Sequence, residues 1–234
     1  MILANVRGRL RGADLRVVLL ALGGRDATAR ARWQQRLETE GPDVLLDQRD
    51  LLGALLAIRS LVIPSAPLFS YVAVRHMLLA AGVDDRALTD YLAALLLEFG
   101  HHDRHIRPAA ATDQTYNYLV DLVSDLSAVS EDGVQGFLLL AHLGNYSLWL
   151  AGLFPDYIEA RHKAGGPDLP YYDGLGRQGF DLASRHALAE RYGVAGIYRE
   201  AADRFPSLRV AFNRLSDRVL FPHVFTAEKV IRNL

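Results

Sequence analysis

The stretch VQGFLLLAHLGNYSLWLAGLF, residues 134–154, decides the fold class, because it is long and apolar on every side of a helix. It is about as long as a helix that crosses a bilayer. Four polar side chains interrupt it, at Gln135, His142, Asn145 and Ser147. A helix that is apolar all round and carries a few polar groups is typical of the centre of a soluble bundle. We therefore expect a buried helix here, and no membrane span.

Helical periodicity continues on both sides of this stretch. Residues 51–62 place apolar side chains at i, i+4, i+7 and i+11, and similar stripes follow along the chain. The last of these patterns breaks near Pro206, and only RVVLLAL, residues 16–22, could equally be a strand. The sequence predicts a single all-α domain over residues 1–234. Its architecture is a compact multi-helix bundle of about eight or nine helices around the central apolar helix.

The composition indicates a well-packed protein without thiol chemistry. Of 234 residues, 50% are hydrophobic and 23% are charged, the net charge is -1, and cysteine is absent. These values argue against disorder, a disulfide framework and any metal site built on thiolates. The N-terminus does not have the pattern of a secretory signal, so we expect a cytoplasmic protein. Arginine far outnumbers lysine, and together with many alanines and leucines this suggests a bacterial source.

The first 36 residues form a basic segment. They contain eight arginines and two aspartates, a charge of +6, whereas the remainder contains 18 basic and 25 acidic residues, a charge of -7. A basic arm can bind nucleic acid, with an affinity that falls steeply as salt is added. No aromatic or glycine pattern of a nucleic-acid module accompanies these arginines. We therefore expect the segment to pair with acidic groups of its own chain or of a second copy.

The stretch EFGHHDRHIRP, residues 98–108, is a candidate metal site. Glu-x-x-His is the spacing that di-iron helix bundles use, and it occurs twice, giving six candidate ligands: Glu98, His101, His102, His105, Glu159 and His162. Iron, manganese or zinc would be the metal, and an oxidoreductase the activity. The alternative is that Gly100 ends a helix. The histidines would then lie beyond it, where imidazolium stabilises the negative end of the helix dipole. We expect no cofactor unless this metal hypothesis holds.

A second candidate site lies on one face of the apolar helix. Its residues are spaced i, i+3, i+4 and i+7: His142, Asn145, Tyr146 and Trp149. Buried polar groups are costly unless they are paired. The face could line a ligand pocket, or it could form an internal hydrogen-bond network that involves Arg59 or Arg75 and an aspartate. The sequence leaves both interpretations open.

The stretch PYYDGLGRQGF, residues 170–180, combines tyrosines with three glycines. We expect an irregular start, followed by a helix that ends at Gly193. A tyrosine- and glycine-rich loop could bind a partner or close over a ligand. The alternative is that the glycines allow a turn or tight helix packing. The dinucleotide fingerprint fails, because no strand is predicted before the glycines.

From the sequence alone we expect a soluble, non-enzymatic interaction or scaffold-type protein whose partner is another protein or a second copy of itself in a homo-oligomer. The alternative is a helical-bundle protein that binds a metal or a small molecule. No catalytic residue can be assigned, since the chain has no cysteine and no serine in a nucleophile elbow.

Overall fold

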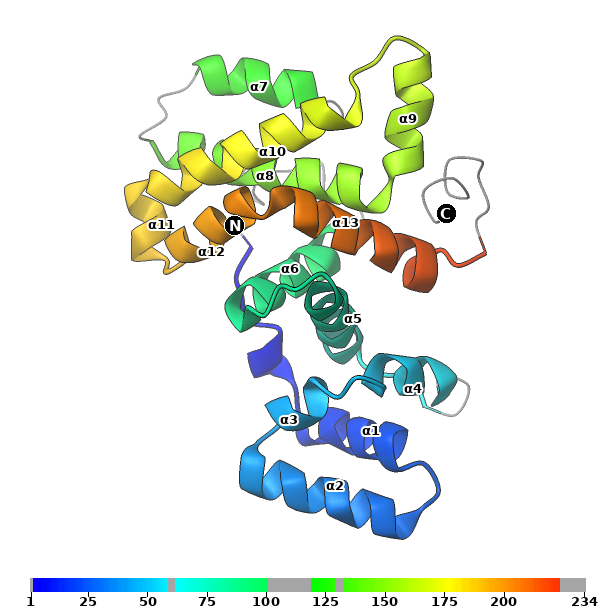
Figure 1. Ribbon diagram of the computed structural model, residues 1–234. Helices are drawn as coiled ribbons and strands as arrows, with labels where there is room; N and C mark the ends of the chain where they lie inside the picture. Colours follow the sequence, from blue (N-terminus) through cyan, green and yellow to red (C-terminus); the bar gives the residue numbers. More distant parts are fainter. Residues whose placement is uncertain (1, 59–61, 101–118, 129–132, 224–234) are drawn as a thin grey trace. The chain divides into compact units, whose positions relative to one another are not determined.

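The computed structural model describes residues 2–58, 62–100, 119–128 and 133–223 (Figure 1). In these ranges the regular structure is helical and contains no strand, so the predicted all-α class is confirmed. The described residues form thirteen α-helices, and the expected count of eight or nine is therefore wrong. Part of the difference is that the stretch expected to be helical up to Gly193 forms two helices, Leu169–Arg185 and Ala187–Arg191.

The chain divides into two compact units, which are described separately here. Residues 3–97 form the N-terminal unit, and the described residues from 98 onward, with residue 2, form the C-terminal unit. Whether the chain acts as the single domain predicted from its sequence stays a prediction.

The N-terminal unit contains a short 3-10 turn, five helices and most of a sixth. Their bounds are Arg7–Arg9 for the turn, α1 Gly12–Gly23, α2 Ala27–Glu40, α3 Asp43–Leu46, α4 Leu51–Ile58, α5 Ala66–Ala80 and α6 Arg86–Gly100. The ambiguous stretch 16–22 is helical, inside α1. Helix α5 begins at a side-chain cap, where Ser65 Oγ accepts from the Leu68 N–H at 3.2 Å. Helix α1 packs against α2 and α4, and α5 packs against α4 and the 3-10 turn.

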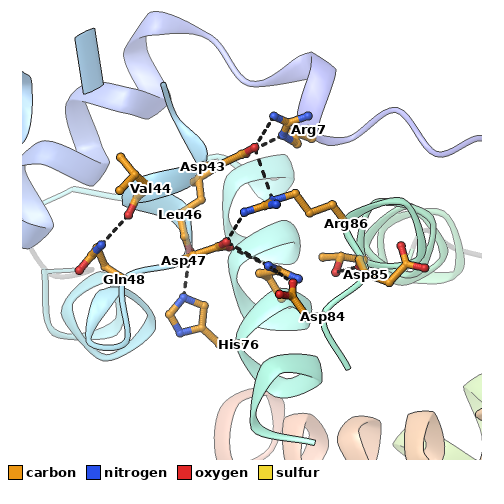
Figure 2. Close-up of polar contacts among 12 residues, drawn as sticks. Arg7, Asp43, Val44, Leu46, Asp47, Gln48, His76, Asp84, Asp85 and Arg86 are labelled. Carbon is orange, nitrogen blue, oxygen red and sulfur yellow. Dashed lines mark hydrogen bonds and ion pairs between the residues drawn. The ribbon is translucent and has the colours of Figure 1, made fainter. Parts of the chain in front are cut away.

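A cluster of charged side chains joins the segments of the N-terminal unit through hydrogen bonds and ion pairs (Figure 2). Arg75 of α5 is 1% exposed and donates to both carboxylate oxygens of Asp47, at 2.7 and 3.0 Å. It also donates to Asp84 at 2.6 Å, and Arg86 reaches Asp47 at 2.5 Å. Arg7 completes the cluster with a bidentate pair to Asp43, at 2.7 and 2.8 Å. Bidentate pairing compensates a buried guanidinium for the water it has lost.

Arg7 belongs to the basic segment of residues 1–36, and Arg36 of the same segment pairs with Glu40 at 2.7 Å. These two arginines thus contact carboxylates of their own chain, as the sequence led us to expect of the segment. Whether the segment also meets nucleic acid or a second copy stays a prediction.

The C-terminal unit is built around the apolar helix. Its helices are α7 Leu119–Ala128, α8 Val134–Leu153, α9 Pro155–Lys163, α10 Leu169–Arg185, α11 Ala187–Arg191, α12 Ala195–Asp203 and α13 Phe205–Leu215, and a π-helical turn, Ser216–Leu220, follows. Figure 1 shows α7, α9, α10 and α13 around α8, and each of them contacts it. Among the described residues, α8 alone has the length and hydropathy to cross a membrane, and 89% of its apolar window is buried in protein. The prediction of a buried central helix is confirmed for this unit.

Two glycines of α10 allow it to lie close against α8. A Cβ atom added at Gly179 would stand 2.7 Å from the backbone nitrogen of Gly144 and 2.9 Å from the carbonyl oxygen of Leu140. A Cβ atom added at Gly176 would stand 3.0 Å from the Cβ atom of Ser147 in α8, and 2.2 Å from the ring of Phe205 in α13. Residues 170–180 are therefore helical from their start, and the predicted binding loop is wrong. The alternative interpretation of tight helix packing is correct for these two glycines.

Two buried polar residues, Asn213 and Ser216, hold the C-terminal end of α8 through hydrogen bonds. The Asn213 amide donates to the carbonyl oxygens of Ala151 and Gly152, at 2.9 and 2.8 Å. The Ser216 hydroxyl donates to the Leu153 carbonyl oxygen at 2.7 Å. The last carbonyls of a helix have no partner inside the helix, so these bonds fix the position of that end. The candidate site is built on this end.

Candidate functional site

A cavity of about 510 Å³ lies in the C-terminal unit beside the last turns of α8. The described residues that line it are Phe99, Gly100, Leu119, Tyr146, Trp149, Leu150, Leu153, Phe154, Tyr157, Arg161, Pro167, Tyr171, Tyr172, Leu220 and Phe221. Its size is in the range of small-molecule sites. These side chains are aromatic or apolar, apart from one guanidinium.

Helix α8 supplies the floor of the cavity. Tyr146, Trp149, Leu150 and Leu153 follow the i, i+3, i+4, i+7 spacing of one helix face, so their side chains point to the same side. Tyr146 and Trp149 are buried, at 4% and 8% exposure. Because the bonds from residues 213–216 hold this end of α8, the floor is a rigid surface rather than a loop.

Helix α9 supplies the polar wall. Phe154 ends α8, and the next residue, Pro155, is the first of α9, a position where the missing N–H of proline costs nothing. Tyr157 and Arg161 then lie four residues apart on the same face of α9. The Arg161 Nη1 donates to the Tyr157 hydroxyl at 2.9 Å, and the guanidinium carbon lies 5.6 Å from the centre of the Tyr157 ring.

The first turn of α10 supplies two more tyrosines. The Asp168 side chain accepts from the Tyr171 N–H at 3.0 Å and so caps the helix. The cap places Tyr171 and Tyr172 at the cavity, with their rings edge to face and 6.0 Å apart. Tyr172 is 7% exposed, whereas Tyr171 is 41% exposed.

Exposed aromatic side chains form the rim of the cavity. Tyr157, Tyr171 and Phe221 are 50%, 41% and 39% exposed, and they are three of the eight large hydrophobic side chains exposed in the described residues. From the rim, ring contacts lead inward through Phe154, which lies 5.9 Å from Phe221 and 5.8 Å from Trp149. Exposed apolar groups gathered at a cavity mark a binding surface more than scattered ones do.

Two phenols of the cavity have raised pKa values. Burial, helped by the neighbouring phenols Tyr157 and Tyr172 and opposed by the charge of Arg161, raises the pKa of Tyr146 to about 12. Burial also raises the pKa of Tyr172, again against the charge of Arg161. Both phenols are therefore protonated at neutral pH and can donate hydrogen bonds.

The structure brings only part of the predicted ligand-binding face to the cavity. The four residues His142, Asn145, Tyr146 and Trp149 are all buried in α8. Tyr146 and Trp149 line the cavity, whereas His142 stacks on the Tyr146 ring and lies against Phe99, with 5.7 Å between ring centres in each case. Arg75, one of the two arginines considered for a network on this face, pairs with Asp47 and Asp84 of the N-terminal unit, and its involvement in that network stays a prediction. Arg59 lies outside the described residues.

The metal hypothesis names six ligands. Three of them, His101, His102 and His105, lie outside the described residues. Glu98 and Gly100 lie in the last described turn of α6, and residues 101–118 lie outside the described residues, so a helix end at Gly100 stays a prediction. Glu159 and His162 belong to α9, and His162 Nδ1 is 2.9 Å from the Gly166 carbonyl oxygen. Within the described part of the chain, no three histidine or acidic side chains gather as ligands for one ion. The metal site stays a prediction.

Sequence reasoning missed Tyr157 and Arg161, because α9 is short and highly charged and therefore resembles an exposed helix. The tyrosine–arginine spacing of four residues was the available signal. No known family model matches the chain, and no curated protein or solved structure is significantly similar to it. The function must therefore be argued from the site itself.

Proposed function

We propose that the protein is a non-enzymatic binding protein whose cavity beside α8 holds a small, largely apolar molecule. The observation that carries the proposal is the cavity of about 510 Å³, floored by Tyr146 and Trp149 and rimmed by exposed aromatic rings. The proposal develops the alternative of a helical small-molecule-binding protein. The interaction or scaffold function, the homo-oligomer and the cytoplasmic location stay predictions.

The polar groups that line the described wall suit binding better than catalysis. An efficient general acid or base has a pKa near the working pH. The pKa of Tyr146 is about 12, and that of Tyr172 is also raised, so neither phenol exchanges protons readily at neutral pH. Such groups hold and orient a ligand through hydrogen bonds.

Trp149 provides a direct test, since it lies in the floor and the chain has only one other tryptophan, Trp33. In a Trp33→Phe background, fluorescence reports on the cavity alone. We expect the neutral probe para-tert-butylbenzamide to change the Trp149 emission in a saturable way and to give a matching calorimetric titration.

Two leucine variants locate the binding. Leu150→Phe fills the cavity and should weaken probe binding about tenfold, or ~1.4 kcal/mol. Leu188→Phe makes the same change at a half-buried leucine of α11 that does not line the cavity, and should bind as the parent does. Absence of saturable binding, or equal binding by the two variants, would contradict the proposal.

A further inference from the structure

Aromatic side chains dominate the lining of the cavity. They make up eight of its fifteen described lining residues, although only 9% of the chain is aromatic. They come from α6, α8, α9 and α10, and from residues 154 and 221 outside these helices. The fold therefore collects rings from distant parts of the sequence around one space, and a ligand in that space meets mainly rings.

Neighbouring rings of the cavity are turned steeply against one another. The Trp149 ring lies 5.6 Å from the Phe99 ring and 5.8 Å from the Phe154 ring, at interplanar angles of 68° and 59°. The Tyr171 and Tyr172 rings meet at 87°. Rings turned in this way cannot all present the same surface, so a ligand that touches several of them meets both faces and edges.

Faces and edges of an aromatic ring interact differently with a ligand. The face is negative and the edge is positive, so two aromatic rings attract each other edge to face or offset, beyond the effect of the area they bury. A flat aromatic ligand can place its edge on one ring of the cavity and its face against the edge of another. A saturated ring of the same outline gains from burial alone.

We propose that the ligand carries an aromatic ring, which lies among the rings of Trp149, Phe154 and the cavity tyrosines. This inference rests on the proposed function and names the ligand class of that site. A quaternary ammonium group is another ligand of aromatic cavities, and it binds over ring faces within about 6 Å. Such a compact group contacts few rings, whereas a cavity of about 510 Å³ has room for a larger flat body that contacts several.

Two probes that differ in the saturation of one ring test this inference by calorimetry: para-tert-butylbenzamide and trans-4-tert-butylcyclohexanecarboxamide. Both carry the same amide and the same tert-butyl group. The saturated probe has the larger apolar area, so burial alone would make it bind more tightly. We expect the reverse order, with the aromatic probe binding about tenfold more tightly, or ~1.4 kcal/mol. Tetramethylammonium should bind more weakly than the aromatic probe.

Two phenylalanine variants assign the preference to the rings of the cavity. Phe154→Leu removes the ring that contacts both Trp149 and Phe221, but keeps an apolar side chain at that position. The preference for the aromatic probe should fall from about tenfold to about threefold, because one ring pair is lost. Phe69→Leu makes the same change at a half-buried phenylalanine of α5 that does not line the cavity, and should keep the full preference.

The outcomes separate this inference from the proposed function. The aromatic assignment alone is overturned if the parent protein binds the saturated probe or tetramethylammonium as tightly as the aromatic probe, or if Phe154→Leu leaves the preference unchanged. Failure of all three probes to bind overturns the proposed function as well. Thermal unfolding of each variant shows that a reduced preference does not come from a lost fold.

Discussion

Arg75 and Arg161 are both shielded from water, but their surroundings differ. Arg75 is 1% exposed and contacts two carboxylates, at 2.7 Å from Asp47 and 2.6 Å from Asp84. Arg161 is half-buried against the ring of Tyr157, and it lines a cavity whose other described side chains are uncharged. The first arginine joins segments of the N-terminal unit, whereas the second can meet a ligand.

The difference has an energetic basis. Taking a charge out of water costs several kcal/mol, and paired carboxylates can offset that cost. Where they do so, as at Arg75, the paired carboxylates contribute to the fold. Arg161, which donates to the Tyr157 hydroxyl, instead lies at the wall of a cavity. Variants in the two regions test whether the Arg75 cluster stabilises the fold and whether the cavity beside α8 binds a ligand.

The largest effect is expected from breaking the N-terminal cluster. Arg75→Met leaves the Asp47 carboxylate without its bidentate partner, and should lower the free energy of unfolding by about 3 kcal/mol. Urea denaturation measures the loss. Arg36→Met breaks the exposed pair with Glu40 and is the matched control, with a far smaller expected change in the free energy of unfolding. If the two losses were alike, the cluster would not be the structural element that we infer.

The second effect concerns the contact that supports the cavity floor. Gly179→Ala places a methyl group 2.7 Å from the Gly144 nitrogen, where backbone cannot yield without moving α8 from α10. We expect a loss of about 2 kcal/mol in the free energy of unfolding. Weaker probe binding should accompany it.

Gly174→Ala provides a control of opposite sign in the same helix. No atom outside the local helix lies within 4 Å of the added carbon, so the alanine should stabilise α10 by about 0.5 to 1 kcal/mol. A destabilising Gly174→Ala would show that glycine is needed along α10 for a reason other than close packing.

The third prediction concerns two carboxyl groups, Asp47 and Asp173, whose contributions to stability should change with pH in opposite directions. Burial alone would raise the pKa of Asp47, but the hydrogen bonds and charges of Arg75 and Arg86 outweigh it and lower the pKa below 3.8. Its stabilising contribution is thus present above the unfolded pKa and is lost as the pH falls through the folded value. The difference in the free energy of unfolding between wild type and Asp47→Asn should become smaller below about pH 4.

Asp173 in the C-terminal unit should behave in the opposite way. Burial raises the pKa of Asp173 above 3.8, although its partner Arg209 opposes the rise. A carboxyl whose folded pKa is raised binds its proton more tightly in the folded state, so the wild type should gain stability over Asp173→Asn as the pH falls through that value. Denaturation at a series of pH values measures the difference in the free energy of unfolding for each pair of proteins. If both differences changed with pH in the same direction, the assignment of the two carboxyls to different environments would be refuted.

The sequence was most informative where one pattern dominated. Residues 134–153 could be predicted as a buried central helix, because a run that is apolar all round leaves few other soluble structures. The prediction of an irregular start for α10 was wrong. It rested on the glycines of this stretch, because glycine has a low intrinsic helix propensity. Tertiary packing overrode that propensity, as the close approach of Gly179 to α8 shows.

The candidate site could be predicted only in part, for a related reason. Tyr146 and Trp149 stood out because aromatic and polar groups are unusual in a buried helix. Tyr157, Arg161 and Tyr172 reach the same cavity from α9 and α10, and no local spacing shows that three helices meet. Asp47, the carboxylate that Arg75 contacts, is 28 residues away in the chain, so no local spacing could name it as the partner.

The smallest effect is expected within the donor wall of the cavity. Tyr146→Phe removes one hydroxyl from the cavity wall, and should weaken benzamide binding about fivefold, close to the ~1 kcal/mol of one hydrogen bond. Because the pKa of Tyr146 is about 12, the benzamide affinity of the parent protein should not change through ionisation of this phenol between roughly pH 6 and pH 10. Calorimetric titration across that range measures it. An affinity that fell near pH 8 in the parent protein but not in Tyr146→Phe would mean that this phenol loses its proton far earlier than its burial allows, and that the wall then loses a hydrogen-bond donor.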